Sequence, residues 1–260
     1  WRRIVYLNHP YAFNCCGYEK DVLSIKYSDI LSEYKRFKKR EKYLISNNPK
    51  IKDLSAKVLE KSIVKKQITN LGSHLSQAQR FISSENKSSQ VILMLGNKTC
   101  SFKNLDYLPL KILESHLSYG MSSALFKLFR EKNGMTYDVG IYHPIRKDDA
   151  PFLIYLSVSN KNALFAFELL IKLWKELLSK SISEDEIFLA KEKLKSSFLF
   201  SNQSLDEKLQ REIQLMSFKM SAYTYDDYLL KMESISPKYL KDLINKYFST
   251  LMSLLELERL

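Results

Sequence analysis

The stretch that decides the fold is DYLPLKILESHLSYGMSSALFKLFREKNGMTYDVG, residues 106–140. Asp106 is suited to cap a helix over about residues 106–117, because a short acidic side chain can accept hydrogen bonds from the free donors of a first turn. The periodicity predicts a second helix over residues 121–132. Gly134 then supplies the left-handed residue that ends many helices. Helix, helix and glycine turn therefore follow one another directly.

Strands are predicted on both sides of these helices. Residues 136–142 and 152–158 are β-prone and are separated by the turn-prone HPIRKDDAP, so a hairpin is the simplest connection. Before the helices, residues 79–83 and 91–95 are joined by the polar SSENKSS and favour a strand pair.

The last part of the chain is rich in helical signals. Residues 162–179 carry an apolar stripe, and Ser183 with Glu186 three residues later forms a capping box for the next helix. A further helix is predicted over residues 205–220, and Ser-Pro at residues 236–237 opens the last one. The order of elements indicates an α+β fold, with an antiparallel sheet covered by helices on one face.

The front of the chain is organised separately. It reads as a helix over residues 27–40, a short strand over 42–46 and an amphipathic helix near 51–63. The pattern weakens from Ile63 to Ser76, where LGSHLSQ carries Gly and Ser without periodicity and predicts a linker. We therefore expect two domains, residues 1–70 and residues 77–260.

The net charge of +12 lies almost wholly in the front. Residues 1–100 hold 19 Lys and Arg against 8 Asp and Glu, whereas residues 101–260 hold 22 against 21. A basic cluster over residues 35–40 has Phe37 as its only aromatic and no nucleic-acid motif beside it, which favours a solvated helix end over a nucleic-acid site. Apolar runs such as residues 163–171 are too short to cross a bilayer, so no membrane partner is expected.

Cysteine and histidine spacing argues against a disulfide framework and a metal site. Cys15, Cys16 and Cys100 form an odd set with an adjacent pair, and adjacent cysteines bridge each other only with strain. The four histidines have no ligand-type neighbours. Reduced thiols indicate a cytoplasmic location.

Residues 106–140 resemble the second-domain signature of the pitrilysin, insulinase and mitochondrial processing peptidase family. In that family a helix beginning at Asp-Tyr leads to a Ser-Ser-x-Leu-Phe-x-x-x-Arg helix, a Gly turn and a strand starting with Tyr. The later elements, including SEDEIFLAKEKL and ISPKYL, fall in the family's order. The front, from His9-Pro10-Tyr11 to KYLIS, is similar to the end of the family's first domain. The resemblance implies a clamshell-peptidase-like fold, in which residues 1–70 end one domain and residues 77–260 form the following, metal-free domain.

The resemblance also implies which chemistry this chain lacks. Family peptidases bind zinc through an H-x-x-E-H helix and a distant Glu, and no histidine here sits in that pattern. By the family's order, the motif would lie upstream of residue 1. The chain is then either a piece of a longer peptidase or a member that never had the motif, and both explanations stay open. We expect no cofactor in this chain and zinc in a complementary half.

Arg130 and Tyr137 are the site residues that the resemblance implies. In the family, an Arg near the end of this helix and a Tyr seven residues later approach the zinc site from the opposite half and hold the substrate. Both are donors that can point at a peptide carbonyl. Without the resemblance, Arg130 would be read as a helix C-terminal cation and Tyr137 as a half-buried strand residue.

Other candidates have plainer interpretations. His116 lies on an apolar helix face and reads as a structural histidine, and His143 opens a loop and is expected to be exposed. Ser122 and Ser123 have no His and Asp at motif spacing, which argues against a nucleophilic serine.

Three functions follow. The first is the substrate-binding, zinc-free half of a peptide-handling metallopeptidase, inactive alone and partnered with a zinc-bearing domain or subunit. The second is a non-catalytic assembly subunit with the same fold. The third is nucleic-acid binding, supported by charge alone.

Overall fold

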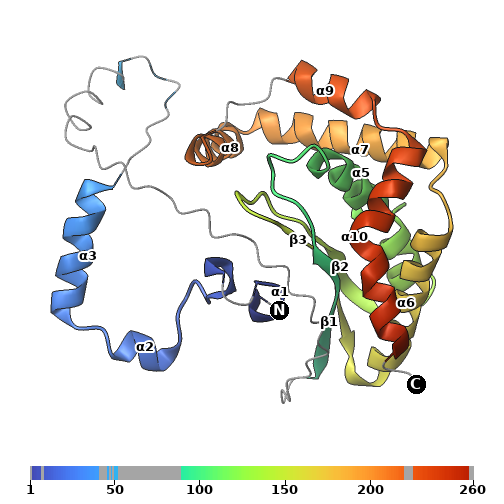
Figure 1. Ribbon diagram of the computed structural model, residues 1–260, viewed down its shortest axis with the longest axis horizontal. Helices are drawn as coiled ribbons and strands as arrows, with labels where there is room; N and C mark the ends of the chain where they lie inside the picture. Colours follow the sequence, from blue (N-terminus) through green and yellow to red (C-terminus); the bar gives the residue numbers. More distant parts are fainter. Residues whose placement is uncertain are drawn as a thin grey trace.

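A three-stranded antiparallel sheet forms the centre of the fold (Figure 1). The computed structural model describes residues 2–6, 9–40, 46, 48, 50, 51, 89–219 and 225–257. The strands are β1 (Gln90–Lys98), β2 (Thr136–Tyr142) and β3 (Pro151–Ser159), in the spatial order β1-β3-β2. The central strand β3 therefore pairs with both of the others.

The sheet confirms the predicted strands. The hairpin of residues 136–142 and 152–158 forms as β2 and β3, and residues 91–95 lie within β1, whose partner is β3. The predicted strand over residues 79–83 lies outside the described residues.

Helices cover one face of the sheet, as the α+β prediction required (Figure 1). Helices α5 (Tyr107–Ser118), α6 (Ala163–Ser179) and α10 (Pro237–Leu257) lie against the sheet, and α7 (Glu184–Gln203) packs on α5, where the Ser115 hydroxyl donates to the Ala190 carbonyl. Alternate β3 side chains, at Phe152, Ile154, Leu156 and Val158, are fully buried against these helices in one continuous core. Such alternation is what a sheet covered on one face requires.

The remaining helices refine the prediction for the last part of the chain. The capping box at Ser183 is present, because its hydroxyl accepts from the backbone N–H of Glu186 and its own N–H donates to the Glu186 carboxylate. Helix α8 (Leu205–Ser217) ends three residues earlier than predicted. Helix α9 (Tyr225–Glu233) was not predicted, and α10 continues as a helix to Leu257.

The front of the chain contains α1 (Arg2–Tyr6), the short 3-10 turn η1 (Pro10–Ala12), α2 (Glu19–Leu23) and α3 (Tyr27–Lys39). Helix α3 confirms the prediction for residues 27–40. Helices α2 and α3 lie apart from the sheet (Figure 1). The predicted strand over residues 42–46, the helix over 51–63 and the domain boundary between residues 70 and 77 lie outside the described residues, apart from Ser46 and Ile51.

The N-terminal segment is attached to the loop between β2 and β3. The hydroxyl of Tyr6 donates to the Asp149 carbonyl over 3.0 Å. The guanidinium carbon of Arg146 lies 4.9 Å from the centroid of the Tyr11 ring. The attachment joins residues far apart in the sequence.

Asp106 does not cap α5 as predicted. Its carboxylate instead accepts hydrogen bonds from three side chains of α10: Tyr239 (2.8 Å), Lys246 (2.6 Å) and Tyr247 (2.8 Å). Burial of the carboxyl opposes its ionisation, but these bonds outweigh burial and lower the pKa of Asp106. A tertiary contact has replaced the expected local one, and it ties the last helix to the start of α5.

We predict that Asp106→Asn lowers the free energy of unfolding at pH 7 by about 2 kcal/mol, since hydrogen bonds to a charged group are the stronger kind. The pKa of Asp106 is lower in the folded state, so its stabilisation is complete above the unfolded pKa of about 4 and is lost as the pH falls through the folded value. The difference between wild type and variant should therefore shrink below about pH 4. Denaturant unfolding between pH 3 and pH 7 measures it.

Asp242→Asn is the matched control, because Asp242 is an exposed acid on the same helix. A difference between wild type and Asp106→Asn that did not vary with pH would contradict a role for the charge.

Candidate functional site

The candidate site begins with an unusual helical turn. Residues Phe126–Glu131 form a π-helix, η2, in which the N–H of Lys132 donates to the carbonyl of Lys127 over 2.9 Å. The helix predicted over residues 121–132 is present in part, and its hydrogen bonds over Phe126–Glu131 are of the π type. Over six residues, the spacing of apolar side chains does not separate a π-turn from an α-turn; only the hydrogen bonds do. Turns of this kind are frequent at functional sites.

A glycine reverses the chain after this turn. Gly134 has φ of +56°, in the region that side chains with a Cβ rarely adopt. Its N–H donates to the Arg130 carbonyl over 3.1 Å, and the N–H of Met135 donates to the Phe129 carbonyl over 2.9 Å. The end of η2 is thus closed by backbone bonds, and the predicted stop at Gly134 is confirmed.

A β-bulge at the start of β2 turns Tyr137 away from the sheet. Thr136 lies opposite Val158 and Val139 lies opposite Leu156, so β2 contains one residue more than β3 over this span. The hydroxyl of Thr136 accepts from the Asp138 N–H and thereby closes the bulge locally. The Tyr137 side chain is 89% exposed.

Arg130 and Tyr137 meet across this reversal. The guanidinium carbon of Arg130 lies 4.7 Å from the centroid of the Tyr137 ring and 5.1 Å from that of Phe126. Arg130 is itself exposed, so the stack lies on the surface. The half-buried position that we considered for Tyr137 does not occur. The stack orients a cation while leaving its N–H groups able to donate.

His143 corrects an expectation. It was expected to be exposed, yet only 3% of it is accessible. Its Nδ1 lies 3.4 Å from Oε2 of Glu114, and the ammonium of Lys111 donates both to that carboxylate and to the His143 carbonyl. Its ring also packs near Tyr107 and Phe152. The following Pro144 indicated a loop, but a loop residue can point inward when a buried carboxylate faces it.

The other candidates behave as structural residues. Burial lowers the pKa of His116, as expected for a histidine on an apolar helix face. Ser123 is buried, and its hydroxyl accepts from the backbone N–H of Phe126. Burial raises the pKa of the Cys100 thiol to about 11, which keeps it protonated. Within the described ranges, no three His, Cys, Asp or Glu side chains are placed to hold a metal ion.

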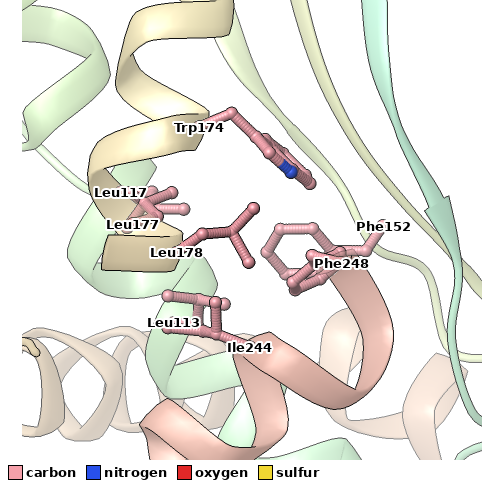
Figure 2. Close-up of a pocket in the computed structure, with 8 residues that line it drawn as sticks. All are labelled: Leu113, Leu117, Phe152, Trp174, Leu177, Leu178, Ile244 and Phe248. Atoms are coloured by element: carbon pink, nitrogen blue, oxygen red, sulfur yellow. The ribbon is translucent and has the colours of Figure 1, made fainter. Parts of the chain in front are cut away.

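A small cavity in the core offers no alternative site (Figure 2). It lies between α5, α6, α10 and β3 and is lined by eight apolar residues: Leu113, Leu117, Phe152, Trp174, Leu177, Leu178, Ile244 and Phe248. Among the lining side chains the ring nitrogen of Trp174 is the single polar atom, and a binding pocket needs a few placed polar groups. We interpret the cavity as a packing gap.

Comparison with known proteins identifies the family of this chain. A model of the family described as "Peptidase M16 inactive domain" matches residues 26–194. The chain belongs to the peptidase M16 family.

Curated relatives are named as zinc proteases. A protein from Bacillus subtilis named "Uncharacterized zinc protease YmxG" is 22% identical over 95% of this chain and 61% of its own length. A Rickettsia felis protein named "Uncharacterized zinc protease" is 33% identical over 46% of this chain and 29% of its own length. The chain thus spans less than two thirds of each of these relatives.

Solved structures share the fold. The peptidase M16 inactive domain from Pseudomonas fluorescens has a TM-score of 0.74 at 18% identity, covering 96% of this chain and 61% of that one. A protease from Helicobacter pylori has a TM-score of 0.73 at 20% identity, covering 95% and 62%. A chain of Complex III2 from Candida albicans has a TM-score of 0.68 at 13% identity, covering 94% and 61%. At these identities the likeness establishes the fold alone.

We predict that His143 makes stability fall as the solution becomes acidic. Burial lowers the pKa of His143 in spite of Glu114, with Lys111 acting in the same direction as burial. Below about pH 6.5, His143 therefore binds a proton more readily in the unfolded chain than in the folded one. This difference lowers the free energy of unfolding as the pH falls. His143→Gln should reduce the loss of unfolding free energy between pH 7.5 and pH 5.5.

His116→Gln should also reduce the dependence of the unfolding free energy on pH, because the pKa of His116 is lowered too. The double variant should show the smallest dependence. Denaturant unfolding at fixed ionic strength gives the slopes. An unchanged slope in His143→Gln would show that the ring does not titrate as its burial implies.

Proposed function

We propose that this chain is the substrate-binding, zinc-free half of a peptide-handling metallopeptidase and is inactive alone. The observation that supports this most is the exposed stack of Arg130 on Tyr137, at 4.7 Å. Exposed aromatic and cationic side chains held in a fixed geometry are typical of binding sites rather than of cores. Neither side chain is needed to fill the interior.

The chemistry of the pair suits a peptide carbonyl. Arg130 carries several N–H donors at the rim of its guanidinium, and the Tyr137 hydroxyl is a further donor. Donors fixed before the substrate arrives stabilise charge that develops on a carbonyl oxygen, without reorganisation during the reaction. The π-turn, the glycine reversal and the bulge all serve to hold the two donors close together.

Zinc does not fit the described residues, since they offer no metal-binding cluster. We therefore assign zinc, and the general base, to a complementary domain or subunit of the same family. Zinc supplies Lewis-acid chemistry where it is bound. Arg130 and Tyr137 bind and orient the peptide from the opposite side.

A second candidate is a non-catalytic role in assembly. The likeness to a chain of Complex III2 from Candida albicans favours it, because that protein is part of a larger complex. The exposed pair distinguishes the two candidates, since an assembly role gives Arg130 and Tyr137 no reason to affect turnover.

The compartment follows from the thiols. Cys15, Cys16 and Cys100 are all free, and the first two are exposed. We propose a reducing compartment such as the cytoplasm on that basis. Within the described residues no helix is long and apolar enough to span a membrane.

We predict that Arg130→Ala and Tyr137→Phe, each made in the zinc-containing protein or in this chain mixed with a zinc-bearing partner, lower kcat by about 10²-fold or more. The size is that expected for losing one donor to a transition-state oxyanion. Stability should change little, because both side chains are exposed. Steady-state cleavage of an unstructured peptide and thermal unfolding measure the two effects.

Matched controls are Lys132→Ala, an exposed cation two residues from Arg130, and Tyr27→Phe, an exposed phenol on α3. Both should retain full activity. Full activity in Arg130→Ala and Tyr137→Phe would favour the assembly role instead.

We also predict that the purified chain holds no stoichiometric zinc and cleaves no unstructured peptide, because its histidines lack ligand spacing. Elemental analysis after dialysis tests the first point. One tightly bound zinc per chain would overturn the proposed division between the two halves.

A further inference from the structure

The turn between η1 and α2 presents two adjacent thiols to solvent. Cys15 and Cys16 are both exposed and free, whereas Cys100 is buried. The Asn14 side chain holds the turn, since its Oδ1 accepts from the Cys16 N–H over 3.2 Å and its Nδ2 donates to the Gly17 carbonyl over 2.9 Å. The two sulfurs therefore lie on a hydrogen-bonded turn rather than on an open chain.

The guanidinium of Arg2 lies beside this turn. It donates to the Phe13 carbonyl over 3.5 Å, and it also hydrogen-bonds to the sulfur of Cys15. The Cys16 thiol is a second hydrogen-bond partner of the same sulfur. Arg2 has the larger effect and Cys16 the next, and together they lower the pKa of the Cys15 thiol. An exposed thiolate beside a cation is the environment of a reactive cysteine.

The positive charge of Arg2 decides which ligand the two thiols suit. A cation beside the sulfurs opposes a metal ion but attracts an anionic reagent. Zinc also needs more ligands than two, and within the described part of the chain no third His, Cys, Asp or Glu side chain joins the pair. A small anionic disulfide, such as oxidised glutathione, suits the site better, because its carboxylates can pair with the guanidinium and its S–S bond is open to attack by a thiolate.

We propose that Cys15 is a modification site that takes a low-molecular-weight thiol of the glutathione class, by exchange with the disulfide of that thiol. The Cys15 thiolate attacks one sulfur of the disulfide, so a bond from Cys15 to that sulfur forms and the original S–S bond breaks. The other half leaves as a thiolate and takes a proton from water. Cys15 is oxidised and the leaving half is reduced, so the step needs no other oxidant.

The adjacent thiol does not reverse this step. Cys16 would have to bridge Cys15 to expel the added thiol, and adjacent cysteines bridge each other only with strain. The mixed disulfide therefore persists until an external thiol removes it, which makes the modification reversible. The site is independent of the proposed function, since it uses neither Arg130 nor Tyr137.

Intact mass spectrometry of the 260-residue chain, incubated with oxidised glutathione at pH 7, provides the first test. We expect one glutathione per native chain in the fast phase, located on Cys15 by peptide mapping and removed by dithiothreitol. Cys100 is the internal control, because burial raises the pKa of its thiol to about 11 and it should react only after unfolding. Attachment first at Cys16 or Cys100, or loss of two thiols without added glutathione, would overturn the proposal.

Arg2→Gln tests the role of the cation. The variant should react about threefold or more slowly at pH 7, and the midpoint of its rate–pH profile should lie at higher pH, because the thiolate has lost its charged partner. Arg36→Gln is the matched control, since Arg36 is an exposed arginine on α3 that pairs with Glu33 over 2.9 Å, and it should leave the rate unchanged. Thermal unfolding checks that both variants are folded.

A peptide of residues 12–18, AFNCCGY, keeps the two thiols and lacks Arg2. It should also react about threefold or more slowly than the folded chain at pH 7, so the comparison holds even if Arg2→Gln does not fold. Equal rates for the folded chain and the peptide would overturn the proposal, and so would an unchanged rate–pH profile in a folded Arg2→Gln variant.

Discussion

The position of β3 between β1 and β2 is the constraint on which the rest of the structure depends. Its alternate side chains must fill the space beneath α5, α6 and α10, and its backbone must satisfy two ladders at once. Strands with both requirements tolerate almost no shift in register, because a slip by one residue exchanges the buried and open faces. The buried side chains of β3 fix its register, and that register sets the position at which β2 begins.

The candidate site is the result of local departures from regular structure at the place where β2 begins. A π-turn, a left-handed glycine and a bulge follow one another within 14 residues, 126–139. Each interrupts the regular backbone hydrogen bonding, and other hydrogen bonds replace what is lost, such as that from the Gly134 N–H to the Arg130 carbonyl. Departures that persist in this way are characteristic of functional regions. Here they bring two exposed donors together without using either for packing.

The sequence predicted most of the fold because its signals were local. The β-prone run of β3, the stripe of α6 and the capping box at Ser183 each operate within one element. What it missed depended on distant partners or on exact hydrogen bonding. Asp106 looked like a helix cap because its three partners lie more than 130 residues away on α10. His143 looked exposed because Glu114, which faces it, belongs to another element.

The candidate pair was predicted by resemblance, and its geometry could not have been. A separation of seven residues permits contact between Arg130 and Tyr137 only if the chain reverses sharply, and Gly134 was the one visible signal of that reversal. The bulge, which turns Tyr137 outward, has no signature in the sequence. Counted back from Val139 without an extra residue, a regular strand would place Tyr137 on the same face as Val139, and the phenol would then compete for space with the core.

The separation of core from site means that the fold does not depend on the site. The buried face of β3 and the tie between Asp106 and α10 stabilise the domain without involving Arg130 or Tyr137. Substitutions at the site therefore cost little stability, and the site can be lost or altered while the fold persists. Conversely, a chain that keeps an exposed cation stacked on an exposed phenol gains no packing from doing so. The proposed peptide binding gives the pair a role that packing does not.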